Sequence, residues 1–134
     1  MRSKTLAVLL FAVIGCQAIS MAHDVQELMI GSPVRQKLFN LLRPTVESRV
    51  DLKVTFYGTM LTDGEWTFFN GVAKGPDGRN VIFAAPDHEN LFALWRLTDG
   101  GWKLVDVAMG RSEGFFGAWR GRYGVPTRVL GLDL

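Results

Sequence analysis

The fold is decided by residues 91–109, which read LFALWRLTDGGWKLVDVAM. The first seven of these residues are almost all apolar, which is typical of a buried strand. The next four, Thr98 to Gly101, are residues that favour tight turns. Residues 102–109 then return with alternating side chains, as a second strand does. This stretch therefore predicts an antiparallel hairpin.

Three segments before this hairpin also have strand character. Residues 52–61 alternate apolar and polar side chains, residues 65–74 follow the hairpin signal at 62–64, and residues 79–84 follow a Gly-Pro-Asp-Gly turn at 75–78. Short connections of this kind join neighbouring strands of antiparallel sheets. The sequence predicts a curled antiparallel sheet of four to five strands.

One long helix is predicted ahead of the sheet, over residues 33–50. Ser32 is a good N-cap and Pro33 suits the first helical position. Apolar residues then recur every three or four positions, forming a single stripe made of Val34, Leu38, Leu41, Leu42, Val46 and Val50. The inner face of the sheet is the only large partner for this stripe. We therefore expect an α+β fold, with an N-terminal helix packed on a curled antiparallel sheet.

The C-terminal segment, residues 110–134, is rich in glycine and aromatic residues. Ser112 is placed to cap a short helix that carries Phe115, Trp119 and Tyr123 at four-residue spacing. Glycine weakens such a helix by roughly 1 kcal/mol per residue relative to alanine. The short C-terminal helical segment therefore forms only if its aromatic side chains are buried.

The first residues match an export signal. Arg2 and Lys4 precede an unbroken apolar run from Leu6 to Ile14, and a small-x-small triplet, Ser20-Met21-Ala22, follows it. The apolar run is shorter than the ~20 residues that a membrane span needs. We expect the protein to be exported, to the periplasm or outside the cell.

Two processing routes remain open. Cleavage after Ala22, which we favour, gives a soluble protein without cysteine. The sequence Val13-Ile14-Gly15-Cys16 is similar to the lipobox of bacterial lipoproteins, and lipidation of Cys16 would hold the protein on a membrane. Under the first route, the chain comprises a signal peptide, an N-terminal arm and a single α+β domain, over residues 1–22, 23–32 and 33–134.

Charge and cysteine content exclude several classes of protein. The 134 residues include 15 Lys and Arg against 13 Asp and Glu. Removal of a leader that holds Arg2 and Lys4 leaves equal numbers of each sign, so we expect no nucleic-acid partner. The single cysteine, Cys16, allows no internal disulfide, so stability must come from an apolar core.

Few residues suit catalysis or metal binding. The two histidines, His23 and His88, are far apart in the sequence and match no metal-ligand spacing. We expect neither a metal nor another cofactor. Acid/base catalysis would depend on carboxylates brought together by the fold, the candidates being Asp51, Glu65, Asp87, Glu89 and Asp106.

Asp106 is the most informative of these carboxylates. Strict alternation along its strand places it on one face with Trp102, Leu104 and Ala108, where it would border a pocket. The interpretation that we favour is an outward Asp106, either solvated or paired with Arg96.

The C-terminal segment supplies the candidate binding residues. Trp119, Arg120, Arg122 and Tyr123 interleave arginine with aromatic side chains, a combination that makes many of the strong contacts at protein interfaces. With Asp106 they form the candidate site. A second interpretation, which we favour, is that the aromatic side chains close the open side of the sheet while the arginines face water.

The layout resembles the cystatin-like and NTF2-like α+β rolls. The sequences GEWTF at 64–68 and GGWKLV at 100–105 are similar to hairpins of small NTF2-like domains. Trp119 and the stretch Tyr123-Gly124-Val125-Pro126 resemble the close of small exported bacterial domains of unknown role. The resemblance spans residues 33–126, and because its motifs are structural it implies a fold and no catalytic residues.

We expect an exported, non-enzymatic binding module for a protein or an envelope component, and an inhibitor or immunity-like role would suit its size. The alternatives are an NTF2-like roll that binds a small molecule and, less favoured, an enzyme that uses pocket carboxylates. A binder of macromolecules should expose its aromatic and arginine residues as a patch. The two alternatives need a concave apolar pocket with converging polar groups.

Overall fold

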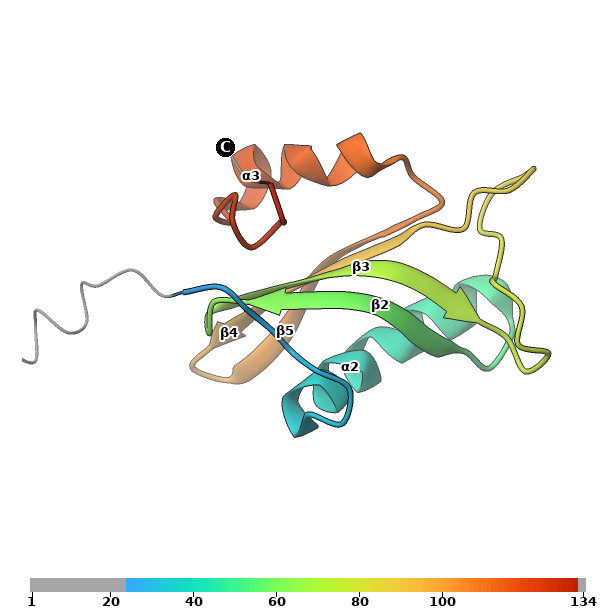
Figure 1. The fold of residues 1–134 in the computed structure, drawn as a ribbon, viewed down its shortest axis with the longest axis horizontal. Helices are drawn as coiled ribbons and strands as arrows, with labels where there is room; N and C mark the ends of the chain where they lie inside the picture. The colour runs from blue at the N-terminus through green and yellow to red at the C-terminus, as the bar shows by residue number, and fades with distance from the viewer. Residues whose placement is uncertain (1–23, 133–134) are drawn as a thin grey trace, which may run out of the picture.

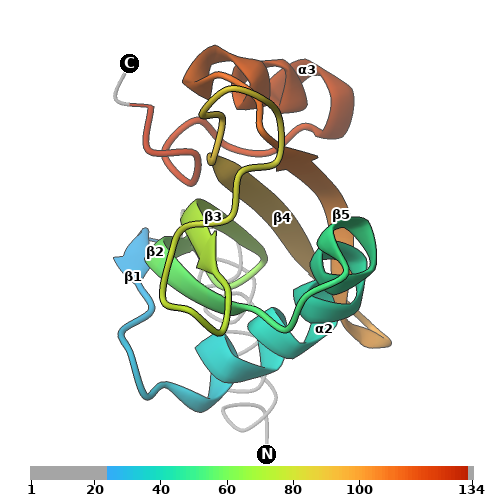
Figure 2. The same ribbon diagram turned by 90° about the vertical axis from the view of Figure 1, so that its right-hand side faces the viewer.

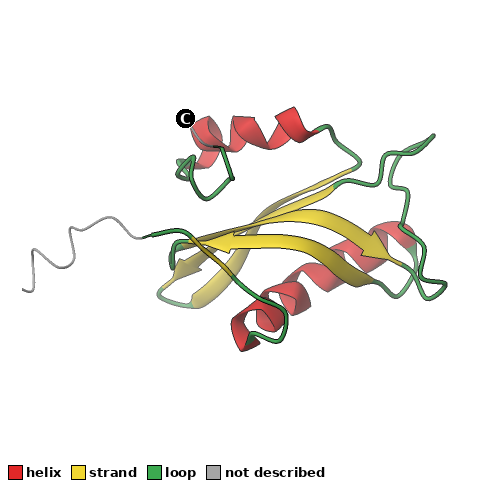
Figure 3. Ribbon diagram, in the orientation of Figure 1, coloured by secondary structure: helices red, strands yellow, loops and turns green. Residues whose placement is uncertain are grey.

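The structure is a computed structural model that describes residues 24–132, and its elements form three layers (Figure 1). The helix α2 (Pro33–Val50) lies on one face of a five-stranded sheet, and the C-terminal residues lie on the other. Figure 3 shows the helices on both sides of the strands. The predicted α+β class is confirmed, with α2 over the expected residues.

The sheet is antiparallel throughout, with its strands in sequence order. These strands are β1 (Gln26–Glu27), β2 (Thr55–Thr62), β3 (Trp66–Lys74), β4 (Leu91–Thr98) and β5 (Gly101–Met109). The short strand β1 pairs only with the end of β2, where Gln26 lies opposite Thr62 and Glu27 opposite Leu61. Among the described residues, no strand pairs with the outer edge of the first part of β2.

The prediction of a strand over residues 79–84 is wrong. Because β4 pairs with β3 only as far as Gly71, this segment can meet just the last residues of β3. It does so at isolated points, where the Val81 N–H donates to the Ala73 carbonyl at 2.7 Å and Asn80 bridges Lys74. The fifth strand is instead β1, within the predicted N-terminal arm.

α2 packs on the sheet through Leu38, Leu42 and Val46, each of which is fully buried. Its start follows the prediction, since the Ser32 hydroxyl accepts a hydrogen bond from the Arg35 N–H and Pro33 occupies the first turn. Figure 2 shows α2 and the C-terminal residues on opposite sides of the strands.

The buried stripe of α2 differs at its margins from the predicted one. Val34 and Leu41 remain 39% and 38% exposed, whereas Arg35 and Phe39 are buried. The helix therefore buries an arginine that the predicted apolar stripe did not include.

The C-terminal residues 110–132, here called the tail, cover the second face of the sheet. Phe116 lies between Phe68 of β3 and Phe92 of β4, with ring centroids 4.8 Å from each. Trp119 is also buried in this cluster. The prediction that aromatic residues of the tail close the open side of the sheet is confirmed.

The tail is less regular than a helix. A 3₁₀ segment, η1 (Glu113–Ala118), leads into the single-turn helix α3 (Trp119–Tyr123). The predicted Ser112 cap is wrong, because its side chain makes no capping hydrogen bond. Gly124 ends α3 in the left-handed conformation, which glycine adopts without steric cost.

The apolar run of β4 is explained by burial on both faces. Leu91, Ala93 and Trp95 belong to the core beneath α2, whereas Phe92 and Leu94 belong to the core beneath the tail. All five are fully buried. In a strand with one solvated face, apolar residues would alternate with polar ones.

We predict that Phe116→Ala lowers the free energy of unfolding by about 3–5 kcal/mol, because it removes a buried ring that packs against side chains of both β3 and β4. The matched control is Phe115→Ala, since Phe115 is only partly buried beside the same cluster, and it should cost clearly less. Urea unfolding followed by tryptophan fluorescence measures both. Equal effects of the two changes would contradict the assigned role of Phe116.

Candidate binding site: a groove between α2 and β2

The candidate residues of the tail form a structural contact. The Tyr123 hydroxyl donates a hydrogen bond of 2.5 Å to Asp106 Oδ2, and an Arg122 Nη1 atom lies 3.9 Å from the same oxygen. The other carboxylate oxygen accepts from the Val107 N–H at 2.8 Å. Asp106 therefore ties the tail to β5.

A β-bulge in β5 accounts for the position of Asp106. Leu94 lies opposite Asp106, but the next residue, Trp95, lies opposite Leu104, so Val105 is an extra residue. The side chains beyond it change faces. The prediction that Asp106 shares a face with Trp102 and Leu104 is therefore wrong.

The pairing predicted for Asp106 is also wrong. Arg96 donates instead to Glu65 Oε2, at 2.9 Å from Nη2. Asp106 has its partners in the tail.

The candidate residues of the tail differ in how far they are exposed to solvent. Trp119 is 1% exposed, so the prediction that it contacts a partner is wrong. Arg120 and Arg122 are exposed, and Tyr123 is half-buried against Asp106. The aromatic residues of the proposed patch are therefore packed in or against the core, and of the four candidate tail residues Arg120 and Arg122 are the exposed ones.

The concave face of the sheet, where the two alternative functions need a pocket, is filled by side chains. Phe39, Phe56, Phe69 and Trp95 occupy the space between α2 and the sheet, while the tail fills the opposite face. Within residues 24–132, no group of three His, Cys, Asp or Glu side chains could hold a metal ion. In the same part of the chain, no helix has the length and hydropathy needed to cross a bilayer.

A groove opens instead at one margin of the molecule, where the start of α2 meets the outer edge of β2. Its volume is about 370 Å³. We call it the α2–β2 groove, and its lining residues are Ile30, Gly31, Ser32, Arg35, Gln36, Phe39, Arg43, Thr55, Phe56, Tyr57 and Gly58. None of these residues is acidic, whereas two are arginines.

Arg35 is the most unusual residue of the groove, since it is only 6% exposed. Its guanidinium donates to the Leu28 and Gly58 carbonyls at 3.0 Å each and lies 5.0 Å from the centre of the Phe39 ring. Carbonyl dipoles and an aromatic face stabilise a cation, but they do not neutralise its charge. Arg35 therefore leaves a buried positive charge at the wall of the groove.

Arg43 lies two turns further along α2 and repeats this arrangement. It donates to the Val54 carbonyl and lies 5.2 Å from the centre of the Phe56 ring. The Val54 N–H donates in turn to Glu47 Oε2 at 2.9 Å. Side chains of α2 thus bind the backbone at the beginning of β2.

The rim of the groove carries exposed apolar side chains. Ile30 is 88% exposed and Tyr57 is 48% exposed, and Met29 beside Ile30 is 63% exposed. Large apolar residues cost free energy when they are solvated, and their grouping around a concave surface is typical of interaction sites.

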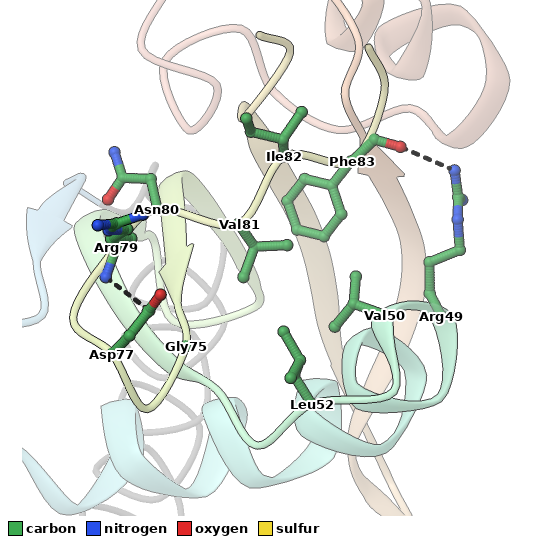
Figure 4. Close-up of a pocket in the computed structure, with 10 residues that line it drawn as sticks. All are labelled: Arg49, Val50, Leu52, Gly75, Asp77, Arg79, Asn80, Val81, Ile82 and Phe83. Atoms are coloured by element: carbon green, nitrogen blue, oxygen red, sulfur yellow. Dashed lines mark hydrogen bonds between the residues drawn. The ribbon is translucent and has the colours of Figure 1, made fainter. Parts of the chain in front are cut away.

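A second groove lies at the other end of α2, beneath the loop that follows β3 (Figure 4). Its volume is about 410 Å³. Val50, Leu52, Val81 and Phe83 point toward one another there, and Arg49 donates to the Phe83 carbonyl at 3.4 Å. Two arginines, Arg49 and Arg79, and one acid, Asp77, lie in this lining, whereas the α2–β2 groove has two arginines and no acid.

No protein-family model, curated protein or solved structure matches the chain. The resemblance to cystatin-like and NTF2-like rolls therefore stays a prediction. The predicted signal peptide and the lipobox at Cys16 lie outside the described residues.

The residues of the α2–β2 groove were not among those that the sequence patterns indicated as a site. Arg35 could have been found, because it precedes the buried Phe39 by four residues and Leu42 by seven, which are helical repeats of one face. Nothing in the local sequence indicated that β1 would stop after two residues and leave the edge of β2 uncovered.

Tyr123 gives a testable pH dependence. The hydrogen bond to Asp106, followed by burial, raises the pKa of Tyr123 above its usual value of 10.0. The folded state therefore holds the phenolic proton more tightly than the unfolded chain does. This contribution to stability is fully present below pH 10.0 and is lost as the pH rises through the raised pKa.

We predict that Tyr123→Phe lowers the free energy of unfolding by about 0.5–1.5 kcal/mol at neutral pH, and that its difference from the wild type shrinks in strong alkali. Since Tyr57 is the only other tyrosine, Tyr57→Phe leaves Tyr123 as the sole phenol for titration by ultraviolet absorbance. Its midpoint should lie above 10 and fall when Asp106→Asn is added. A midpoint that Asp106→Asn leaves in place would refute the assigned cause.

Proposed function

We propose that the chain is an exported, non-enzymatic binding module that recognises another protein at the α2–β2 groove. The observation that carries this proposal is the meeting of uncompensated positive charge with exposed apolar side chains. Arg35 and Arg43 line the groove, and neither forms an ion pair with a carboxylate among residues 24–132, while Ile30 and Tyr57 stand exposed at its rim.

The composition of the groove supports a protein partner. Arginine and tyrosine are enriched among the residues that contribute most to protein interfaces. The two arginines are held in place by backbone carbonyls and aromatic rings, so binding would cost little side-chain entropy. An inhibitor or immunity-like role is one form that such a module takes.

The chemistry of the groove also supports binding without catalysis. Its lining contains no carboxylate, imidazole or thiol. The one hydroxyl on α2's side, that of Ser32, serves the helix start by accepting from the Arg35 N–H at 3.4 Å. The hydroxyls of Thr55 and Tyr57 also line the groove, but a nucleophilic hydroxyl needs an adjacent base, and the lining holds none of these groups to serve as one.

Export is supported by the sequence of the first 22 residues. We predict that the secreted or envelope form begins at His23, because Ser20-Met21-Ala22 satisfies the small-x-small rule for cleavage. Mass spectrometry of the N-terminus measures this directly. A mature protein that begins with an acylated Cys16 would replace the soluble form with a membrane-anchored one, and an uncleaved Met1 would contradict export.

We predict that a photo-crosslinking amino acid at position 30 or 57 captures the partner in living cells. The same label at position 82 or 97 should not capture it, although Ile82 and Leu97 are 54% and 42% exposed. The four positions therefore compare exposed apolar side chains that differ in location.

A matched pair of substitutions then tests affinity for the captured protein. Ile30→Ser should weaken binding by about tenfold or more, because it removes an apolar contact at the rim. Ile82→Ser, in the second groove, should leave it nearly unchanged. The reverse pattern would place the site in the second groove. Capture of the partner only by a crosslinking label at position 120, in place of the exposed Arg120, would place the site on the tail.

A further inference from the structure

The outer edge of β2 runs along the α2–β2 groove. β1 covers this edge only at Leu61 and Thr62, and the Leu28 N–H extends the pairing by donating to the Met60 carbonyl at 2.8 Å. The chain then leaves the sheet to begin α2. Residues 55–58 of β2 form one wall of the groove without a strand beside them among the described residues.

Alternation along β2 identifies the backbone groups on this edge. The carbonyls of Met60 and Gly58 both accept hydrogen bonds there, from Leu28 and from Arg35. Every second residue of an antiparallel strand directs its N–H and C=O to the same side. The Phe56 N–H and C=O therefore also point to the outer edge.

The opposite strand supports this assignment. Ala73 is the residue of β3 that lies opposite Phe56, and its carbonyl accepts from Val81, on the side away from β2. Phe56 and Ala73 thus form a pair that exchanges no hydrogen bonds. Within residues 24–132, neither backbone group of Phe56 has a hydrogen-bond partner, although the groups on both sides of it are bound by Arg35 and Arg43.

We infer that an extended segment of the partner adds to β2 as an edge strand, pairing with the Phe56 backbone and placing an acidic side chain against Arg43. This inference rests on the proposed function and specifies how the groove would be used. An added strand satisfies both open backbone groups of Phe56 at once, since a directly opposed residue exchanges two hydrogen bonds.

The acidic side chain follows from charge. The guanidinium groups of Arg35 and Arg43 both line the groove, and no carboxylate lies among its lining residues. A carboxylate binds a guanidinium through charge-assisted hydrogen bonds, which are stronger than neutral ones. The side chains next to the acid along the segment would be apolar, because Ile30 and Tyr57 flank the groove.

Charge also argues against a second copy of this chain as the occupant. Pairing of two β2 edges around Phe56 would bring the arginines of both copies together in one confined space. Like charges that face one another across paired strands are destabilising. A partner that carries the opposite charge has no such cost.

The test uses short random peptides displayed on phage and selected on the purified mature protein. Enriched peptides should contain an Asp or Glu residue with an apolar residue on each side of it. One synthetic peptide from the selection is then titrated against the wild type, Arg43→Gln, Arg43→Lys and Arg49→Gln. Arg49 is the matched control, because it also lies on α2 and binds a backbone carbonyl, but in the second groove.

Arg43→Gln should weaken binding by about tenfold or more, Arg43→Lys by less, and Arg49→Gln by about twofold at most. N-methylation of each peptide nitrogen in turn should abolish binding at the residue opposite Phe56 and be tolerated at the two residues beside it. We expect this alternation because neighbouring N–H groups of an added strand point to opposite sides. Circular dichroism confirms that each protein variant is folded.

Three results would overturn the inference: peptides without an acid, equal affinity for Arg43→Gln, or an N-methyl pattern without alternation. A dimer of the wild type that Arg43→Gln dissociates would make a second copy the occupant and would also overturn it. If the effects of N-methylation do not alternate but Ile30→Ser lowers the affinity for the peptide, the proposed function stands and only strand addition fails. Peptide binding that is insensitive to Ile30→Ser contradicts the groove itself.

Discussion

The structure depends on a sheet that is apolar on both faces and must be covered on both. β4 shows this constraint most clearly, since consecutive residues from Leu91 to Trp95 are buried alternately beneath α2 and beneath the tail. The tail has a poor intrinsic preference for helix, and it keeps its place because Phe116 and Trp119 are buried and because Tyr123 binds Asp106. Covering the second face therefore uses the aromatic residues that looked like a binding patch in the sequence.

This constraint also determines where the molecule can bind other molecules. With both faces of the sheet filled, concave surfaces in the described part of the chain lie where α2 or a loop meets the margin of the sheet. At one margin, β1 ends early. Beyond its end, the Arg35 side chain links the two segments by donating hydrogen bonds to the Leu28 and Gly58 carbonyls. A buried cation, two aromatic rings and an unpaired stretch of backbone consequently share one groove. Edge strands are usually protected against unwanted pairing, and cationic side chains are one common protection. The partner strand that we propose would therefore have to bring a compensating charge.

Much of the fold could be predicted because it follows from local patterns. The helical period from Pro33 to Val50 and the Asp-Gly and Gly-Gly turns predicted α2 and the two hairpins to within one residue, except that β2 begins three residues later than expected. The candidate site could not be predicted in the same way. The bulge at Val105 breaks the alternation on which the face of Asp106 was assigned. Helical spacing places Arg35 on the buried face of α2, but the carbonyls that its guanidinium binds lie 7 and 23 residues away in sequence. Long-range contacts of this kind leave no periodic signal.

The most direct test of the two-sided sheet is a chain that ends after Gly110, studied with and without a synthetic peptide of residues 111–134. Without the tail, Phe68 and Phe92 would lose their cover, and we predict a protein that lacks the dispersed amide NMR spectrum of a folded sheet. Adding the peptide should restore that spectrum. A truncated chain that is monomeric, dispersed and as stable as the full chain would contradict the claim that the second cover is required.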